Sequence, residues 1–305
     1  MHVVISGSSG LIGGALAASL LDDGHRVTRL VRREPRPRQD GSEEARWDPQ
    51  AGLLDPAVLE GADAVVGLAG AGVGDRRWTR AYKQRIRDSR VLGTTALATA
   101  VTACEKPPPV FVSGSAVGYY GETGTAEVDE SGAPGRDFLA GVCEEWETAA
   151  QAARAVETRV VNTRFGIVVS PRGGAMGRLL PLARAGLGGR LGSGDQYWSH
   201  ISLNDTVRAL RHLIDTDTVT GPVNMTSPHP ATNREVTAAV GNALHRPTVF
   251  AVPGFALRLV LGEFADGILM SQRVLPAALL ASGFTFEYPT IEAALAAAVG
   301  RGSVG

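Results

Sequence analysis

A glycine-rich segment near the N-terminus constrains the fold more than any other part of the chain. The apolar run Val3–Ile5 has strand character, and the residues from Leu11 to Leu20 have apolar positions spaced for one face of a helix. A turn between such a strand and helix lets the backbone approach a pyrophosphate, which the positive end of the helix dipole also attracts. A turn with only a packing role is the alternative, but the strand–turn–helix context favours a dinucleotide site. The predicted binding residues are Gly7, Gly10, Leu11, Ile12 and Gly13.

Predicted strands and helices alternate from this segment to about residue 165. The strands are expected at His25–Val31, Ala45–Trp47, Ala62–Leu68, Val110–Ser113 and Arg159–Arg164, and the longer helices at 79–104 and 137–156. Alternation of this kind is typical of an α/β fold, a Rossmann-type doubly wound parallel sheet. Ligands bind such a sheet at the carboxyl ends of its strands.

The rhythm changes at about Gly166, where glycine-rich loops and shorter elements begin. We expect residues 1–165 to form the nucleotide-binding domain, with a returning segment near 199–216. Residues 166–305 are expected to form a smaller, mixed C-terminal domain that covers the substrate. Asp205 is expected to cap a helix over 206–214, and the tail 300–305 to be disordered.

Composition narrows the class of partner. The net charge is −1, which gives no reason to expect nucleic acid or an anionic membrane as partner. The most apolar late stretch, 249–270, contains Pro253, Arg258, Glu263 and Asp266, which argues against a membrane span. Cys104 and Cys143 are the only cysteines and have no metal-ligand spacing around them, so we expect two reduced thiols and no metal site. A cytoplasmic protein is expected, and the sequence makes no prediction of oligomeric state.

Several separated segments together resemble the extended short-chain dehydrogenase/reductase superfamily, which contains nucleotide-sugar epimerases and dehydratases. The segments are Ser6–Gly13, Asp63–Ala69, Arg90–Thr94, Ser113–Gly121 and Gly194–Asp205. Finer details resemble an atypical branch known as "epimerase family protein", whose members are sometimes labelled nucleoside-diphosphate-sugar epimerase or cell-division inhibitor. These details include Trp47–Pro49, Arg77–Trp78, Leu244–Pro247 and Gln272–Pro276. The resemblance covers essentially the whole chain and implies a nicotinamide cofactor and a small polar substrate.

The end of the second predicted strand indicates which nicotinamide cofactor is bound. NAD enzymes usually place an acidic residue there for the ribose 2′-hydroxyl, whereas an arginine accommodates the 2′-phosphate of NADP. The strand continues into Arg32 and Arg33, with no acidic residue before Glu34. A solvated basic loop is the alternative interpretation, but we predict NADP(H).

The resemblance implies further cofactor contacts. Leu68 and Ala69 would pass under the adenine and ribose at the end of their strand. Arg90 stands where the superfamily usually has Asn, and its implied role is contact with the NADP phosphates or ribose. Arg164 ends a predicted strand and is expected to face the cofactor or the substrate, with an interdomain ion pair as the alternative.

The catalytic pair of the superfamily is absent. Its chemistry uses a Tyr and a Lys four residues apart on one helix, where the ammonium lowers the pKa of the phenol. Lys83 and Lys106 are the only lysines, and neither follows a tyrosine at that spacing. Alignment by chain spacing places Leu139 and Cys143 at the two positions, or Phe138 and Val142 in the alternative register.

Ser115, Tyr119 and Tyr120 remain as candidate catalytic residues, because they follow the strand 110–113 and should lie at its carboxyl end. The alternative is that the tyrosines pack under the C-terminal domain and the serine caps a turn. A phenol without a cationic neighbour has a pKa near 10 and is a poor base at neutral pH. The sequence therefore predicts an NADP(H)-binding oxidoreductase or epimerase-like protein, with a non-catalytic NADP(H) sensor as the alternative.

Overall fold

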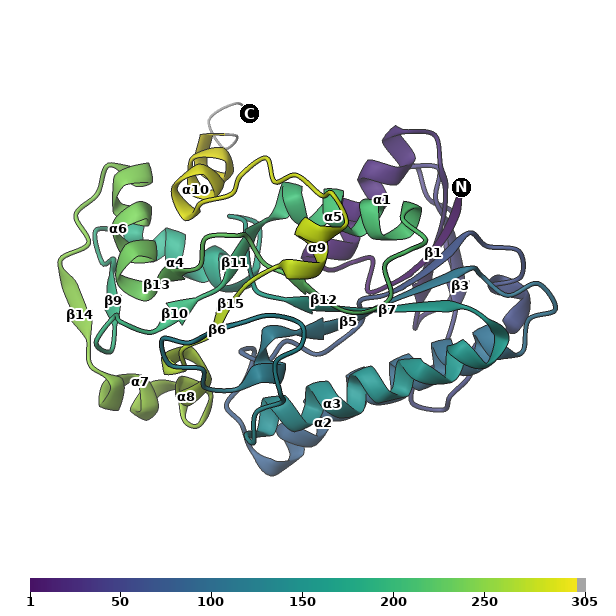
Figure 1. The fold of residues 1–305 in the computed structure, drawn as a ribbon, viewed down its shortest axis with the longest axis horizontal. Coiled ribbons are helices and arrows are strands. Elements are labelled where there is room, and N and C mark those ends of the chain that lie inside the picture. The colour runs from purple at the N-terminus through teal and green to yellow at the C-terminus, as the bar shows by residue number, and fades with distance from the viewer. Residues whose placement is uncertain (301–305) are drawn as a thin grey trace.

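The computed structural model describes residues 1–300, and its centre is a parallel sheet of seven strands (Figure 1). In order across the sheet the strands are β12 (Gly221–Met225), β7 (Arg159–Phe165), β5 (Val110–Ala116), β4 (Ala64–Gly67), β1 (His2–Ser6), β2 (Arg26–Val31) and β3 (Glu43–Arg46). Every neighbouring pair is parallel. The strand order reverses between β1 and β4, and such a reversal opens a ligand crevice at the carboxyl edge. The predicted doubly wound α/β fold is confirmed.

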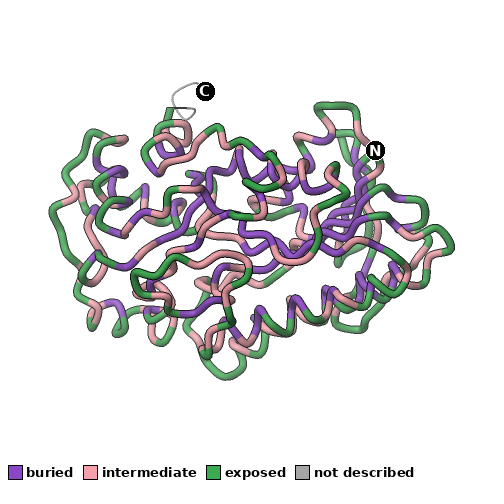
Figure 2. The backbone as a smooth tube through the Cα atoms, viewed as in Figure 1, coloured by how far each residue is buried: buried purple, intermediate pink, exposed green. Residues whose placement is uncertain are grey.

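Helices cover both faces of the sheet (Figure 1). One face is covered by α1 (Leu11–Asp22), α5 (Leu203–Asp215) and α9 (Ala277–Ala281), and the other by α2 (Arg80–Thr102) and α3 (Phe138–Ala150). The 3₁₀ turns are η1 (Pro56–Val58), η2 (Val117–Tyr120) and η3 (Gln151–Val156). The inner strands of the sheet are almost continuously buried (Figure 2), because apolar side chains from both helix layers pack on them. The edge strand β3 is partly exposed.

Some element bounds differ from the sequence expectations. The strand β5 continues three residues past Ser113, and the helix expected over 137–156 changes to a 3₁₀ turn after Ala150. The strand β12 was not predicted, because Gly221 and Pro222 obscure its signal. Proline is tolerated there because β12 is an edge strand, which within residues 1–300 pairs only with β7.

The rest of the chain builds a second group of short elements. They are β6 (Glu127–Val128), β8 (Ile167–Val169), α4 (Gly174–Arg184), β9 (Gly189–Leu191), β10 (Tyr197–Trp198), β11 (His200–Ser202), β13 (Ala231–Thr232), α6 (Asn233–Leu244), β14 (Phe250–Val252), α7 (Gly254–Leu261), α8 (Phe264–Leu269), β15 (Arg273–Val274) and α10 (Ile291–Gly300). Their own core contains Met176, Leu180, Val236 and Leu295. Figure 1 shows most of them at the end of the molecule far from the N-terminus, whereas α5 lies beside α1 on the main sheet. The division at residue 165 and the returning segment 199–216 stay predictions.

The expected role of Asp205 is wrong. The helix α5 begins at Leu203, and Ser202 caps it by accepting a hydrogen bond from the Asp205 backbone N–H at 2.9 Å. A serine followed three residues later by an acidic residue places the acid inside the first turn. The Asp205 carboxylate is fully buried and accepts from the backbone N–H groups of Glu287 and Tyr288, both at 2.9 Å. It therefore fastens the C-terminal segment to α5.

None of the helices within residues 1–300 has the length and apolar character needed to cross a bilayer. The stretch 249–270 folds instead into β14, α7 and α8. Most of the tail expected to be disordered, residues 301–305, lies outside the described part of the chain.

Candidate functional site

The glycine turn between β1 and α1 forms a tight cradle. Gly7 has φ +72°, and a Cβ atom there would lie 2.6 Å from the carbonyl carbon of Leu68. A Cβ at Gly13 would lie 2.5 Å from the Gly7 oxygen. Side chains at these positions would separate α1 from the ends of β1 and β4. Gly10 is the N-cap of α1 and provides no side-chain oxygen, so the first N–H groups of the helix stay open to an anionic ligand.

Leu68 and Ala69, predicted to pass under the adenine and ribose, lie directly against this cradle. The two residues follow β4, and the Ala69 nitrogen would be 2.7 Å from a Cβ at Gly7. A dinucleotide needs a backbone surface of this kind beside the helix start. The cradle therefore fits the cofactor that the motif implies.

A buried arginine that the sequence analysis missed supports the cradle from β2. Arg29 donates from Nη1 to the Ser8 carbonyl oxygen at 3.2 Å and from Nε to Ser42 Oγ at 2.9 Å. Its Nη2 lies 3.1 Å from Asp40 Oδ2. A charged residue within the apolar strand Val27–Val31 was the available signal, because an arginine is rarely placed in a buried strand without a partner.

Arg32 and Arg33 differ in how they are engaged. Arg33 donates two hydrogen bonds to the Glu44 carboxylate, at 2.7 and 2.8 Å, and lowers the pKa of that carboxyl to about 2. Arg32 is exposed and forms no ion pair with any residue between 1 and 300. Of the two predicted phosphate ligands, Arg32 is therefore the one whose guanidinium is available.

Arg164 lies at the centre of a buried polar cluster at the carboxyl end of β7. Its Nε and Nη2 donate to the two Glu147 oxygens at 2.7 and 2.9 Å, and the ion pair is almost wholly shielded from water. Its Nη1 donates to the Tyr120 hydroxyl at 2.9 Å, and its Cζ lies 3.5 Å from the centre of the Tyr119 ring. The ion pair predicted as an alternative for Arg164 is present, but it joins β7 to α3 within residues 1–165.

The three candidate catalytic residues lie around this cluster and differ in how far hydrogen bonds already engage their hydroxyl groups. Ser115 Oγ donates to Glu147 Oε1 at 2.6 Å. The Tyr120 hydroxyl donates to Asn224 Oδ1 at 2.7 Å, and burial raises the pKa of this phenol to about 12. Tyr119 is only partly buried, and its hydroxyl forms no hydrogen bond with residues 1–300. Tyr119 is thus the member best able to exchange a proton with a ligand.

The helix α3 offers no substitute for the absent catalytic pair. Cys143 is buried, its thiol donates to the Ala116 carbonyl oxygen at 3.7 Å, and burial raises the pKa of the thiol to about 12. Such a thiol stays protonated at neutral pH and is a poor nucleophile. Leu139 is aliphatic, and in the other register Phe138 and Val142 carry no titratable group either.

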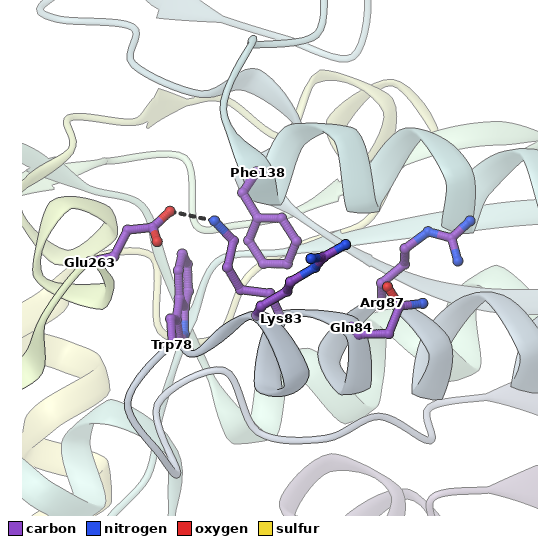
Figure 3. Close-up of a pocket in the computed structure, with 7 residues that line it drawn as sticks. Trp78, Lys83, Gln84, Arg87, Phe138 and Glu263 are labelled. Atoms are coloured by element: carbon purple, nitrogen blue, oxygen red, sulfur yellow. Dashed lines mark hydrogen bonds and ion pairs between the residues drawn. The ribbon is translucent and has the colours of Figure 1, made fainter.

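A hollow of about 400 Å³ lies where the first turns of α2 and α3 meet the start of α8 (Figure 3). Lys83 Nζ lies 2.5 Å from Glu263 Oε1 and 4.5 Å from the centre of the Phe138 ring. The lining combines aromatic rings with cationic side chains: Trp78, Arg80, Lys83, Gln84, Arg87, Phe138 and Glu263. Helix N-termini in this fold lie at the carboxyl edge of the sheet, so the hollow is on the ligand-binding side.

No group of three or more His, Cys, Asp or Glu side chains within the described 300 residues is arranged to hold a metal ion. Both cysteines of the chain are free.

Comparison with known proteins places this site in a family. Residues 3–226 match the family model "NAD dependent epimerase/dehydratase family", and residues 252–298 match a domain of unknown function, DUF1731. "Epimerase family protein Mb2239" of Mycobacterium bovis is 48% identical over 300 residues, which are 98% of this chain and 98% of the relative.

Solved structures agree with the sequence comparison. The crystal structure of human epimerase family protein SDR39U1 with NADPH superposes with a TM-score of 0.90 and 34% identity, covering 98% of this chain and 99% of that one. MoeE5, solved in complex with UDP-glucuronic acid and NAD, is 22% identical with a TM-score of 0.78 over the full length of both chains, a likeness of fold alone. The chain belongs to the NAD-dependent epimerase/dehydratase family.

Proposed function

We propose that the protein binds NADP(H) at the carboxyl edge of β1, β2 and β4 and acts as an oxidoreductase or epimerase-like enzyme. The substrate would be a small polar molecule such as a sugar or nucleotide sugar. The observation that carries the proposal is the glycine cradle against Leu68 together with the available guanidinium of Arg32. The human relative crystallised with NADPH adds support. A cytoplasmic location, with no nucleic-acid partner, accords with the free cysteines and near-zero net charge.

The cofactor residues divide by the part of the ligand that they would hold. The cradle glycines Gly7, Gly10 and Gly13, with the first turn of α1 at Leu11 and Ile12, would hold the pyrophosphate. Leu68 and Ala69 would lie along the ribose, and Arg32 would hold the 2′-phosphate, with Arg33 adding positive charge while bound to Glu44. NADP(H) supplies hydride exchange when bound.

Proton transfer falls to Tyr119 in this proposal. Its ring lies against the Arg164 guanidinium, and its hydroxyl has no hydrogen-bond partner among residues 1–300, so the hydroxyl is open to a substrate oxygen. The Tyr120 hydroxyl donates to Asn224 and accepts from Arg164, and the Ser115 hydroxyl donates to Glu147. These two residues would therefore position the cluster and accept a hydrogen bond from a substrate hydroxyl. Without an adjacent lysine, we expect slow turnover or a substrate that needs no strong base.

The hollow beside α2 supports an anionic substrate. Among its lining cations, Lys83 pairs with Glu263 and Arg87 with Glu145, whereas Arg80 forms no ion pair within residues 1–300. Cations beside the Trp78 and Phe138 rings suit a ligand that carries both a planar group and a phosphate or carboxylate.

A non-catalytic NADP(H) sensor is the second candidate. It is favoured by the raised pKa values of Tyr120 and Cys143, which leave both groups protonated and unreactive at neutral pH. The sensor would keep the cofactor residues of the first candidate and need no proton donor.

Turnover measurements separate the two candidates. The purified protein is incubated with NADP⁺ or NADPH and a panel of sugars, nucleotide sugars and small carbonyls. Nicotinamide absorbance is followed and the products are analysed, because an epimerase regenerates its cofactor. The enzyme proposal expects turnover that Tyr119→Phe abolishes without loss of NADPH binding. Binding without turnover on any member would favour the sensor, and absence of binding would overturn both.

A further inference from the structure

Arg90 is held rigidly between the loop after β4 and the helix α3. Its Nη1 donates to the carbonyl oxygens of Ala71 and Ile86, both at 3.0 Å. Its Cζ lies 5.1 Å from the centre of the Trp146 ring. The guanidinium lies against the backbone at Gly70, where an added Cβ would be 3.4 Å from Cζ.

The charge of Arg90 has no counter-ion among residues 1–300. No carboxylate within residues 1–300 lies within ion-pair distance of it, whereas the buried Arg29 and Arg164 both have one. Burial lowers the pKa of Arg90, and the neighbouring Cys143 thiol is protonated at neutral pH. A shielded charge without a partner is costly, so the environment favours an anionic or strongly accepting ligand.

Part of the guanidinium remains available to such a ligand. Nη1 makes both carbonyl bonds, and Nε and Nη2 donate to no group among the described residues. Within residues 1–300, the side-chain atoms that are both buried and without a hydrogen-bond partner are Asn162 Oδ1 and Arg273 Nε. Nε and Nη2 of Arg90 are not among them, so solvent reaches both atoms. Donors that face water beside a fixed cation are ready to bind a ligand oxygen.

Arg90 lies above the carboxyl ends of β4 and β5. Gly70 and Ala71 follow β4, and Trp146 packs on β5, where a Cβ at Gly114 would lie 2.8 Å from its ring. Arg32 lies at the end of β2, on the other side of β1. Three strand spacings separate β2 from β5, roughly 14 Å. A dinucleotide spans the crevice with one half on each side of the reversal, so Arg90 is on the half opposite Arg32.

This inference rests on the proposed function. We propose that Arg90 binds the nicotinamide-ribose half of NADP(H), donating from Nε and Nη2 to ribose hydroxyls or to the adjoining phosphate. Arg90 would supply a fixed cation at that half of the groove. The chain has no lysine to do so, because Cys143 stands at the position of the superfamily's lysine.

Calorimetry with two probes tests the assignment. NADPH contains both halves of the ligand, whereas adenosine 2′,5′-bisphosphate contains only the half assigned to Arg32. Arg90→Met is expected to weaken NADPH binding roughly tenfold to a hundredfold, as for a lost hydrogen bond to a charged group. The affinity for the bisphosphate should stay unchanged. Arg90→Lys, which keeps a cation, should recover part of the loss.

Two control variants calibrate the comparison. Arg32→Ala should weaken both probes. Arg85→Met should weaken neither, because Arg85 lies exposed on the same helix and lines neither the cradle nor the hollow beside α2. An unchanged NADPH affinity in Arg90→Met, or an equal loss for both probes, would overturn the assignment. If Arg90→Met does not fold, the NADPH affinities of Arg90→Gln and Arg90→Lys are compared instead, and the variant that keeps the cation should bind more tightly. Failure of the wild-type protein to bind either probe would instead overturn the proposed function.

Discussion

At the scale of single residues, buried charged side chains explain most of the site residues that sequence motifs do not identify. Arg164 and Glu147 lie 17 residues apart on different elements, and their side chains are 3% and 12% exposed. Their mutual hydrogen bonds, with Ser115 and Tyr120 on the outside, satisfy groups that would otherwise be costly to bury. The ion pair therefore fixes the strand β7 against α3 at the edge where the ligand is proposed to bind.

Removal of the acidic partner should be strongly destabilising. Glu147→Gln leaves Arg164 buried without a counter-charge, so the free energy of unfolding should fall by about 3 kcal/mol. Glu145→Gln is the matched control, because this carboxylate lies on the same helix but is 44% exposed, and its loss should cost about 0.5 kcal/mol. Urea denaturation of both variants measures the difference, and equal losses would contradict the account.

His200 should make stability depend on pH. Burial lowers the pKa of this imidazole to about 4, and its Nε2 lies 3.2 Å from Ser227 Oγ. Between about pH 6.5 and pH 4 the unfolded chain binds a proton that the folded protein does not, so stability falls as the pH falls.

The His200→Gln variant isolates this contribution. It should lose about 2.5 kcal/mol less than the wild type between about pH 7.5 and pH 4.5, because one depressed imidazole pKa accounts for that amount. Urea denaturation at the two pH values gives both differences. An identical loss in the two proteins would show that His200 does not titrate across this range.

Residues whose role is set by local backbone needs are predictable from the sequence, and residues whose role depends on distant partners are not. The cradle glycines belong to the first kind, because a turn between strand and helix requires them. Arg29 and Asn224 belong to the second kind: their partners lie between 11 and 104 residues away along the chain. The absence of the Tyr and Lys pair follows from the sequence alone. The protonated state of Cys143 depends on its burial, which the sequence does not show.

At the scale of elements, the close approach of α1 to the carboxyl ends of β1 and β4 is the feature on which the binding site depends. Gly7 combines a left-handed backbone with direct contact against Leu68. Gly24 has a similar φ of +76° but faces open space. Comparing substitutions at Gly7 and Gly24 therefore separates the stability lost to backbone strain from the stability lost to a steric clash.

Alanine substitution at the two glycines should therefore have unequal effects. Gly24→Ala carries only the left-handed penalty of roughly 1 kcal/mol. Gly7→Ala adds the clash with Leu68, so we expect a loss of stability at least twice as large and loss of NADPH binding. Thermal unfolding and calorimetry measure the two effects. A Gly7→Ala protein as stable as Gly24→Ala would show that the cradle is not tight.

Element prediction succeeded where periodicity was long and failed where the chain returned to the sheet. The alternation over 3–165 identified six strands of the main sheet because each is a buried apolar run between helices. The strand β12 and the start of α5 were missed or misplaced, since Pro222 and Ser202 acquire their roles only from the neighbours they meet.

At the scale of the whole molecule, the charge distribution matches an extended ligand with anionic groups at separate positions, as NADP(H) has. Arg32 is available at the β2 side of the crevice, and Arg90, at the β4 and β5 side, has no counter-ion within the described residues 1–300. The glycine cradle lies between them. The cationic hollow beside α2 adds a third region at the same edge, where the proposed substrate would bind.

The comparison of NADPH with NADH by titration calorimetry tests the central claim most directly. The account predicts that NADPH binds at least about tenfold more tightly, because a guanidinium meets the 2′-phosphate, and that Arg32→Ala narrows the difference. Equal affinities that Arg32→Ala leaves unchanged, or no heat of binding with either ligand, would contradict it.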